Sequence, residues 1–157
     1  MAEPKKTIVL ISSEGTEHEV DAAAALECSV TIKNMVEMGV EGPVPLRYVN
    51  SATVAKVVEF WSHYRHQHGD IDGAGGEAAW EAEFFDCTIG DLCDMLKAAN
   101  FLVDEKLLDR AACTVADRIK NMSVEVVRNV FRVENDFTPE EEAEERSKYP
   151  WAFDGCH

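Results

Sequence analysis

The sequence predicts an α/β fold in which a small amount of β structure near the N-terminus is followed by a series of helices. β-Branched and apolar residues fill residues 7–12 and 16–20, and Glu14 with Gly15 supplies a turn between them, which is the pattern of a β-hairpin. Farther along, apolar residues recur every three or four positions, as they do in amphipathic helices. The length of 157 residues fits one ordinary domain with room for an appended arm.

Between the hairpin and the middle of the chain, the sequence predicts two short helices, an extended segment and a long helix. Asp21 and Ser29 have side chains that cap helices, and each precedes a short apolar run. Two prolines lie in or beside residues 44–49, whose β-type pattern therefore predicts an edge strand or an extended connector. Ser51 is predicted to cap the clearest amphipathic helix. Its apolar residues at helical spacing are Val54, Val57, Val58, Trp61 and Tyr64.

The second half of the chain is predicted to be helical after a break. Residues 67–77 are rich in Gly and Asp and lack periodicity, which predicts a mobile loop. Thr88, followed three residues later by an acid, marks one helix start, and Asp104 and Ser123 mark the next two. Asn100 is predicted to break the helix that begins after Thr88.

The composition disfavours two classes of partner. The chain has 30 acidic and 15 basic residues and a formal net charge of -15. Such a field repels phosphate backbones and anionic lipid head groups, so we expect neither nucleic acid nor a membrane surface as a partner. An acidic surface also keeps a protein soluble, and for that reason the charge alone identifies no partner.

The cysteines and the N-terminus indicate a reducing compartment. The five cysteines form an odd set without a C-x-x-C pair, which favours reduced thiols over a disulfide framework or a zinc module. They are Cys28, Cys87, Cys93, Cys113 and Cys156, of which we expect the first four to be buried. The apolar run at residues 8–11 is too short for a signal-peptide core or a membrane span. We therefore expect the nucleus and the cytoplasm.

Catalysis, cofactors and bound metals have little support in the sequence. The cluster His63, His66 and His68, with Asp70 and Asp72 nearby, has metal-ligand residue types. Its position at the end of a helix that enters a loop favours solvated side chains instead. No G-x-S-x-G, P-loop or H-E-x-x-H pattern occurs. We expect no enzymatic activity, no cofactor and no metal site.

The helix predicted at residues 139–148 has a well-specified start but almost no apolar face. Thr138 can cap it, Pro139 takes the first helical position, and acids follow at the positive end of the helix dipole. About ten residues are too few for a stable helix alone in water. Aromatic residues flank it, namely Phe137, Tyr149, Trp151 and Phe153. They either fold back onto the chain's own core or anchor the helix on another protein, because aromatics are enriched at binding hot spots.

Ordered blocks of sequence cover nearly the whole chain. They are SVTIKNM at 29–35, PVPL at 43–46 with VN at 49–50, AANFL at 98–102, LLD at 107–109, and NDFTPEEE at 135–142 with WAF at 151–153. Together these blocks resemble the S-phase kinase-associated (Skp) adaptor family. The Pro-Trp-Ala-Phe ending resembles its plant members.

The resemblance implies a BTB/POZ-like α/β core, a small sheet flanked by helices, followed by C-terminal helices. Residues 1–66 would form the N-terminal half of the core, residues 78–121 the rest of it with cullin-facing helices, and residues 122–157 the F-box-binding helices and tail. The implied function is that of a non-catalytic adaptor of cullin-RING (SCF) ubiquitin ligases. It would bridge the N-terminal region of a cullin to F-box substrate receptors for protein ubiquitination.

The resemblance also implies two sets of site residues. Asn100 and Phe101 match the family's cullin-contacting Asn-Tyr pair, with a hydroxyl removed by the change to Phe. The positions that match the F-box-binding surface are Val127, Phe131, Val133, Asn135, Phe137 and Trp151.

The last helix departs from the family pattern. Glu145 stands where the family usually has an aliphatic residue, and Tyr149-Pro150 replaces a polar pair. These changes predict a divergent paralogue with a narrower set of F-box partners. The alternative functions are a BTB-like homo-oligomeric scaffold and an F-box-protein partner that acts outside ubiquitin ligases.

Overall fold

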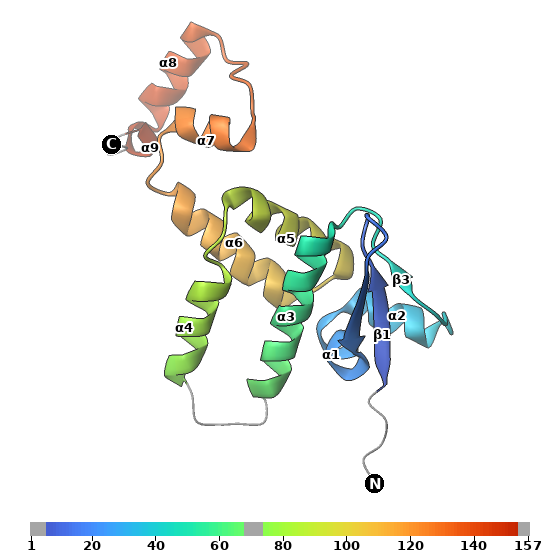
Figure 1. Ribbon diagram of the computed structural model, residues 1–157. Helices are drawn as coiled ribbons and strands as arrows, with labels where there is room; N and C mark the ends of the chain where they lie inside the picture. The colour runs from blue at the N-terminus through green and yellow to red at the C-terminus, as the bar shows by residue number, and fades with distance from the viewer. Residues whose placement is uncertain (1–5, 68–73, 154–157) are drawn as a thin grey trace. The chain divides into compact units, whose positions relative to one another are not determined.

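The computed structural model describes residues 6–67 and 74–153 and divides into two compact units, Met1–Ala112 and Cys113–His157. The N-terminal unit combines a small sheet with helices (Figure 1). In chain order its elements are β1 (Thr7–Ile11), β2 (Glu17–Asp21), α1 (Ala22–Cys28), α2 (Val30–Glu37), β3 (Val44–Pro45), α3 (Ser51–Gln67), α4 (Ala74–Phe84), α5 (Ile89–Leu102) and α6 (Glu105–Ile119), within which the boundary between the units falls.

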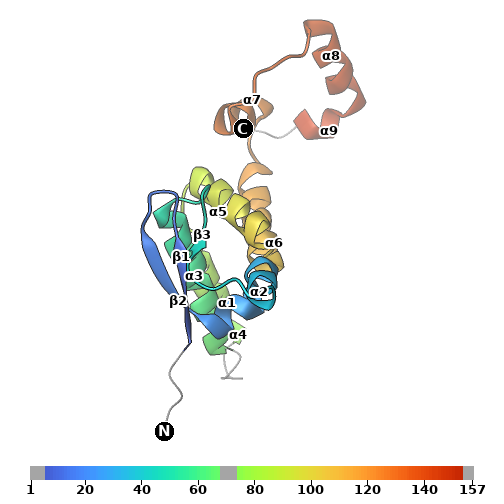
Figure 2. The same ribbon diagram turned by 90° about the vertical axis from the view of Figure 1, so that its right-hand side faces the viewer.

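The sheet has the strand order β2-β1-β3. β1 pairs antiparallel with β2 and parallel with β3, and Leu10 lies opposite both His18 and Val44. The predicted hairpin and edge strand are therefore confirmed. Figure 2 shows the strands at one side of this unit, with α1 and α3 packed against them. The sheet contributes to the core through the buried side chains of Leu10 and Val20.

Capping side chains start several helices as predicted. Asp21 accepts a hydrogen bond from the amide of Ala23, and Ser29 accepts one from the amide of Ile32. Thr88 forms a complete capping box with Asp91 at the start of α5. Each of these bonds satisfies an amide that has no partner within its own helix.

The prediction that Ser51 caps α3 is wrong. The side chain of Asn50 accepts from the amide of Thr53 at 2.8 Å, so Asn50 takes the capping role. Ser51 is held from the hairpin instead, because its amide donates to Glu14 at 2.8 Å and its hydroxyl oxygen lies 2.9 Å from Nε2 of His18.

Two predicted interruptions are also corrected. α5 continues through the exposed Asn100 to Leu102 and ends at Val103, whose φ is 50°. Burial of Ala99 and Leu102 on either side outweighs the modest helix propensity of Asn. α4 begins at Ala74, inside the predicted 67–77 loop, although two glycines follow Ala74. Residues 68–73 of that loop lie outside the described residues.

Asp104 joins α3 to α6 in the core of the N-terminal unit. Its carboxylate accepts from Nε1 of Trp61 at 2.7 Å and from the amide of Leu107 at 3.1 Å. Asp104 is 2% exposed and Trp61 is fully buried. Burial raises the pKa of this carboxyl above its ordinary value, while the hydrogen bonds from Trp61 and the backbone oppose the shift. The predicted cap at Asp104 is thus confirmed.

The C-terminal unit contains three short helices, none of which has a buried residue. They are α7 (Val124–Phe131), α8 (Pro139–Lys148) and α9 (Pro150–Phe153). Ser123 caps α7, and Thr138 forms a capping box with Glu141 at the start of α8, as predicted. α8 ends at Lys148 because the next residue, Tyr149, precedes a proline, which disfavours the helical conformation.

The cysteines are more exposed than the sequence predicted. Cys28, Cys87 and Cys93 are half-buried and Cys113 is exposed. Cys156 lies outside the described residues.

Within residues 6–67 and 74–153, no group of three potential metal ligands comes together. His63 stacks on Trp80 with ring centroids 3.5 Å apart. The side chain of His66 and all of His68, Asp70 and Asp72 lie outside the described residues. In the described part of the chain, no helix is both long and apolar enough to cross a membrane.

Candidate protein-binding surfaces

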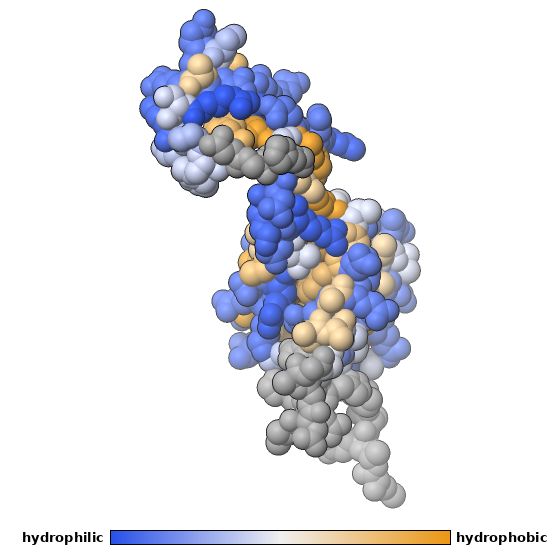
Figure 3. All heavy atoms as spheres, turned by 90° about the vertical axis from the view of Figure 1, so that its left-hand side faces the viewer, coloured by the Kyte–Doolittle hydropathy of each residue, from blue (hydrophilic) through white to orange (hydrophobic). Residues whose placement is uncertain are grey.

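The C-terminal unit exposes a set of large apolar side chains, which we call the apolar set. It comprises Val126, Val130, Phe131, Val133, Phe137, Tyr149 and Trp151. Figure 3 shows apolar side chains gathered among polar ones in the upper part of the view. Trp151 is 77% exposed and Phe137 48% exposed, so these aromatics do not fold back onto a core. Large apolar side chains exposed together on a protein indicate a surface for a partner.

Local hydrogen bonds fix the connector between α7 and α8. Arg132 ends α7 in the left-handed conformation with φ 54°, which turns the chain at Val133. Asn135 then accepts from the amide of Phe137 at 3.2 Å, and the Thr138 capping box follows. The six predicted F-box positions all lie on α7, this connector and α9. The structure therefore brings them into one unit, although Val127 is only half-exposed.

A groove of 570 Å³ lies along the end of α7 and the connector. Its lining includes Arg128, Asn129 and Arg132 from the helix region, and it shares Val133 and Asn135 with the predicted F-box positions. Polar groups beside an apolar set are typical of the rim of a protein interface.

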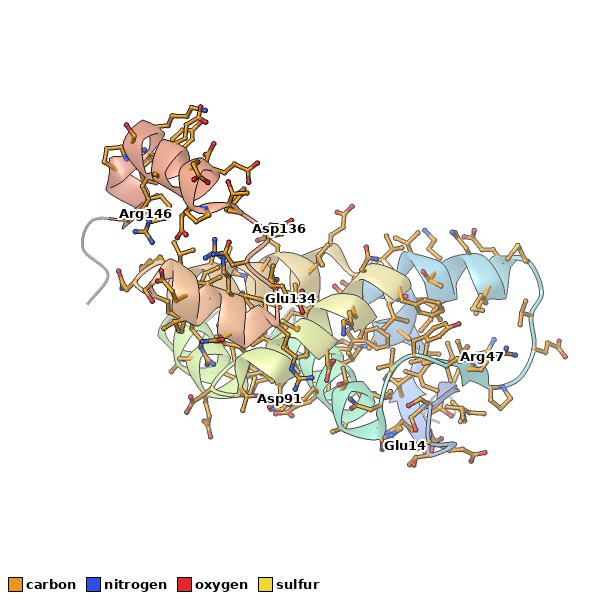
Figure 4. All side chains as sticks on the ribbon, turned by 90° about the horizontal axis from the view of Figure 1, so that it is seen from above. Glu14, Arg47, Asp91, Glu134, Asp136 and Arg146 are labelled. Carbon is orange, nitrogen blue, oxygen red and sulfur yellow. The ribbon has the colours of Figure 1, made fainter. Side chains whose placement is uncertain are left out.

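Ion pairs link the helices of the C-terminal unit. Nη2 of Arg146 lies 3.2 Å from Oε1 of Glu125 on α7 and 3.1 Å from Oε1 of Glu142 on α8. Figure 4 shows the Arg146 side chain extending from α8 toward α7. The pKa of the Glu125 carboxyl is lowered, first by a hydrogen bond from its own backbone amide and then by the charge and hydrogen bond of Arg146. No sequence pattern predicts this role of Arg146.

The predicted cullin-contacting pair lies at the last turn of α5. Asn100 is exposed and Phe101 is 44% exposed. Hydroxyls from the cap and the first turn of α2 bond to this turn. Ser29 donates to the carbonyl of Leu102 at 2.7 Å, and Thr31 donates to the carbonyl of Phe101 at 2.8 Å. The sequence predicts Ser29 as a helix cap, but no sequence pattern predicts the bonds of Ser29 and Thr31 to the turn of α5.

A pocket of 300 Å³ beside this turn is lined by Cys28, Tyr64, Asp104 and Lys106, among others. Burial, followed by the charges of Asp104 and Glu27, raises the pKa of the Cys28 thiol to about 12. The Cys28 thiol is therefore protonated at pH 8, whereas the thiolate is the nucleophilic form. The pocket therefore does not hold a reactive cysteine.

A short pulse of N-ethylmaleimide at pH 8 is expected to label the exposed Cys113 and to leave Cys28 unmodified, because the Cys28 thiol stays protonated. Peptide mass spectrometry measures both sites, and the urea-unfolded chain provides the control in which both react. Equal labelling of the two cysteines in the folded protein would contradict the raised pKa.

Comparison with known proteins finds relatives that align with nearly the whole chain. The chain matches the model of the Skp1 family tetramerisation domain over residues 6–66 and that of the Skp1 family dimerisation domain over residues 105–152. It is 42% identical to SKP1-like protein 1A of Arabidopsis thaliana, with 95% of this chain and 98% of that protein covered. It is 39% identical to SKP1-like protein 3 of Arabidopsis thaliana, with 98% and 100% covered, and 39% identical to SKP1-like protein 1 of Oryza sativa subsp. japonica, with 96% of each covered.

Proposed function

Because the chain belongs to the Skp1 family, whose members are non-catalytic adaptors, we propose that it bridges a cullin to F-box substrate receptors in SCF ubiquitin ligases. The C-terminal unit holds the F-box, and the last turn of α5 meets the N-terminal region of the cullin. The protein performs no bond chemistry. It raises the effective concentration of substrate lysines near the ubiquitin-carrying enzyme by holding both partners in one assembly.

The apolar set is the observation that carries this proposal. None of the three helices of the C-terminal unit has a buried residue, and yet the unit presents Phe131, Phe137 and Trp151 at its surface. Covering these aromatics with an apolar partner surface would stabilise the complex, and aromatic side chains dominate many interfaces. The groove beside the apolar set carries both signs of charge, Arg128 and Arg132 with Glu125 and Glu134, and so offers charged groups for the rim of the interface.

The last helix supports a narrower set of F-box partners than a typical family member has. Glu145 lies 3.7 Å from Nζ of Lys148, so a charged pair occupies the site of the usual aliphatic residue. Pro150 ends α8 and starts the separate turn α9, which carries Trp151. Both changes alter the surface next to the apolar set.

Binding to a panel of F-box domains measures how many of them the chain accepts. A range of partners as broad as that of SKP1-like protein 1A would reject the narrower set.

Reconstitution tests the proposed function. The full chain is mixed with a panel of F-box domains and with the N-terminal region of a cullin, and native mass spectrometry measures the assemblies. A complex with one copy of each protein is the expected result. Self-assembly that excludes every F-box domain would favour the homo-oligomeric scaffold, and F-box binding without cullin binding would favour a role outside ubiquitin ligases.

Substitution of Asn100 and Phe101 together by Ala is expected to weaken cullin binding roughly tenfold to a hundredfold, because both side chains are exposed at the turn and truncation of a hot-spot aromatic costs about 2 kcal/mol or more. Titration calorimetry with the cullin fragment measures the change. F-box affinity serves as the internal control and is expected to stay the same. Unchanged cullin affinity would remove the turn from the interface.

A further inference from the structure

The guanidinium of Arg146 lies among all three helices of the C-terminal unit. It contacts Glu125 of α7, Glu142 of its own helix α8, and the ring of Phe153 in α9, above which its Cζ sits 4.5 Å from the centroid. We infer that Arg146 is a positioning residue of the F-box-binding surface, which holds α8 and α9 in place against α7 through Glu125. This inference rests on the proposed function, because it assigns Arg146 a role in that same site.

Burial of apolar side chains contributes little to holding α7, α8 and α9 together. α7, α8 and α9 have no buried residue, and Ala143 is the only apolar side chain of α8 besides Pro139. The second cation of α8, Lys148, pairs with Glu144 at 2.8 Å and with Glu145 at 3.7 Å, both on α8 itself. Lys148 therefore supports the helix, whereas Arg146 joins it to its neighbours.

The chemistry of arginine suits this position. A planar guanidinium carries several donors in a fixed geometry and also stacks on aromatic rings, so one side chain can serve two carboxylates and a phenyl ring. A lysine ammonium is a point charge and lacks the flat face. Glu125 adds to the arrangement because it lies in the first turn of α7, where the helix dipole favours an acid.

The relative placement of α7, α8 and α9 affects partner binding because the apolar set is split between these helices. Val130 and Phe131 belong to α7, Trp151 belongs to α9, and a partner must contact both groups at once. A partner that meets helices already in place loses less conformational freedom on binding. The contacts of Arg146 thus increase affinity for the partner, although Arg146 is not one of the predicted F-box positions.

Two matched pairs of variants test the inference with an F-box domain from the panel that binds the wild-type chain. Glu125→Gln and Glu142→Gln each remove one carboxylate from the same guanidinium nitrogen, but only Glu125 lies on another helix. Arg146→Met and Lys148→Met each remove one cation from α8. We expect roughly two- to fivefold weaker F-box binding for Glu125→Gln and about tenfold for Arg146→Met, since exposed pairs contribute modestly. Glu142→Gln and Lys148→Met are expected to change affinity less than about twofold.

A double-mutant cycle separates positioning from a general loss of stability. Glu125→Gln is expected to have no further effect in the Arg146→Met background and its full effect in the Lys148→Met background. Circular dichroism checks that α8 retains its helicity. Multiplicative effects of Glu125→Gln and Arg146→Met, or equal losses for Arg146→Met and Lys148→Met, would overturn the inference.

A second readout needs no F-box domain. Carboxyl NMR titration of Glu125 in the free chain is expected to show a higher pKa in Arg146→Met than in wild type, and no such rise in Lys148→Met. An unchanged pKa in Arg146→Met means that the contact is absent in solution and overturns the inference. If the wild-type chain binds no F-box domain, the proposed function fails, and the titration shows separately whether Arg146 holds Glu125.

Discussion

A chain that ends at Glu134 is expected to bind F-box domains at least about a hundredfold more weakly than the full chain, with unchanged affinity for the cullin fragment. The deletion removes Asn135, Phe137 and Trp151 together with all of α8 and α9. Two hot-spot aromatics at about 2 kcal/mol each account for a loss of this size. The N-terminal unit keeps its own core around Trp61, Leu92 and Met95, so the last turn of α5 remains folded.

Titration calorimetry against both partners measures this selectivity, and circular dichroism confirms that the truncated chain is folded. Phe137→Ala with Trp151→Ala in the full chain removes only the two aromatic side chains and is expected to act in the same direction. Tyr48→Ala is the matched control, because Tyr48 is a 90% exposed aromatic of the N-terminal unit. Unchanged F-box affinity of the truncated chain would reject the F-box assignment of the C-terminal unit.

Asp104→Ala is expected to lower the free energy of unfolding by about 3 kcal/mol. The substitution leaves Nε1 of the buried Trp61 without its acceptor and removes the cap from the amide of Leu107. A lost cap costs about 1 kcal/mol and an unsatisfied buried donor about 1–3 kcal/mol. Chemical denaturation followed by Trp fluorescence measures the change. Asp109→Ala, at an exposed position of α6, is the control. Its free energy of unfolding should stay within about 0.5 kcal/mol of the wild-type value.

The cost of Asp104→Ala is also expected to depend on pH. Burial raises the pKa of Asp104 in the folded state above the ordinary 3.8, with the hydrogen bonds opposing the shift. A raised carboxyl pKa contributes stability that is complete below the unfolded value and is lost as the pH rises through the folded value. The difference between wild type and variant should therefore grow as the pH is lowered from 8 toward the acid range. A difference that shrinks over this range would contradict the raised pKa.

Local signals predicted the helix starts well because capping bonds form between residues two or three positions apart. Asp21, Ser29, Thr88, Ser123 and Thr138 all cap as expected. The error at Ser51 arose because Asn50 is an equally good cap and because the choice depends on distant groups. Its neighbours Glu14 and His18 come from the hairpin, which no local pattern connects to this helix.

The exposure of the site residues and their contacts between helices depend on nonlocal packing, which the sequence alone does not predict. The residue pattern predicted α8 and its missing apolar face, but it left open whether the flanking aromatics cover the chain's own core. The exposure of Phe137 and Trp151 decides against that. The Skp resemblance and the α/β fold of the BTB/POZ type with C-terminal helices are confirmed by the family matches. The roles of Arg146 and Thr31, and the bond of Ser29 to Leu102, could not be predicted because these contacts join separate helices.

The hydroxyl contacts of the α5 turn also set an order of events during synthesis. Ser29 and Thr31 bond to carbonyls that follow them by 73 and 70 residues. A ribosome adds about 5–20 residues per second, so these hydroxyls wait roughly 4–15 s before their partners are made. The strands and α1 can form in that interval, but the bonded last turn of α5 cannot. A nascent chain can thus complete its sheet before the proposed cullin site exists.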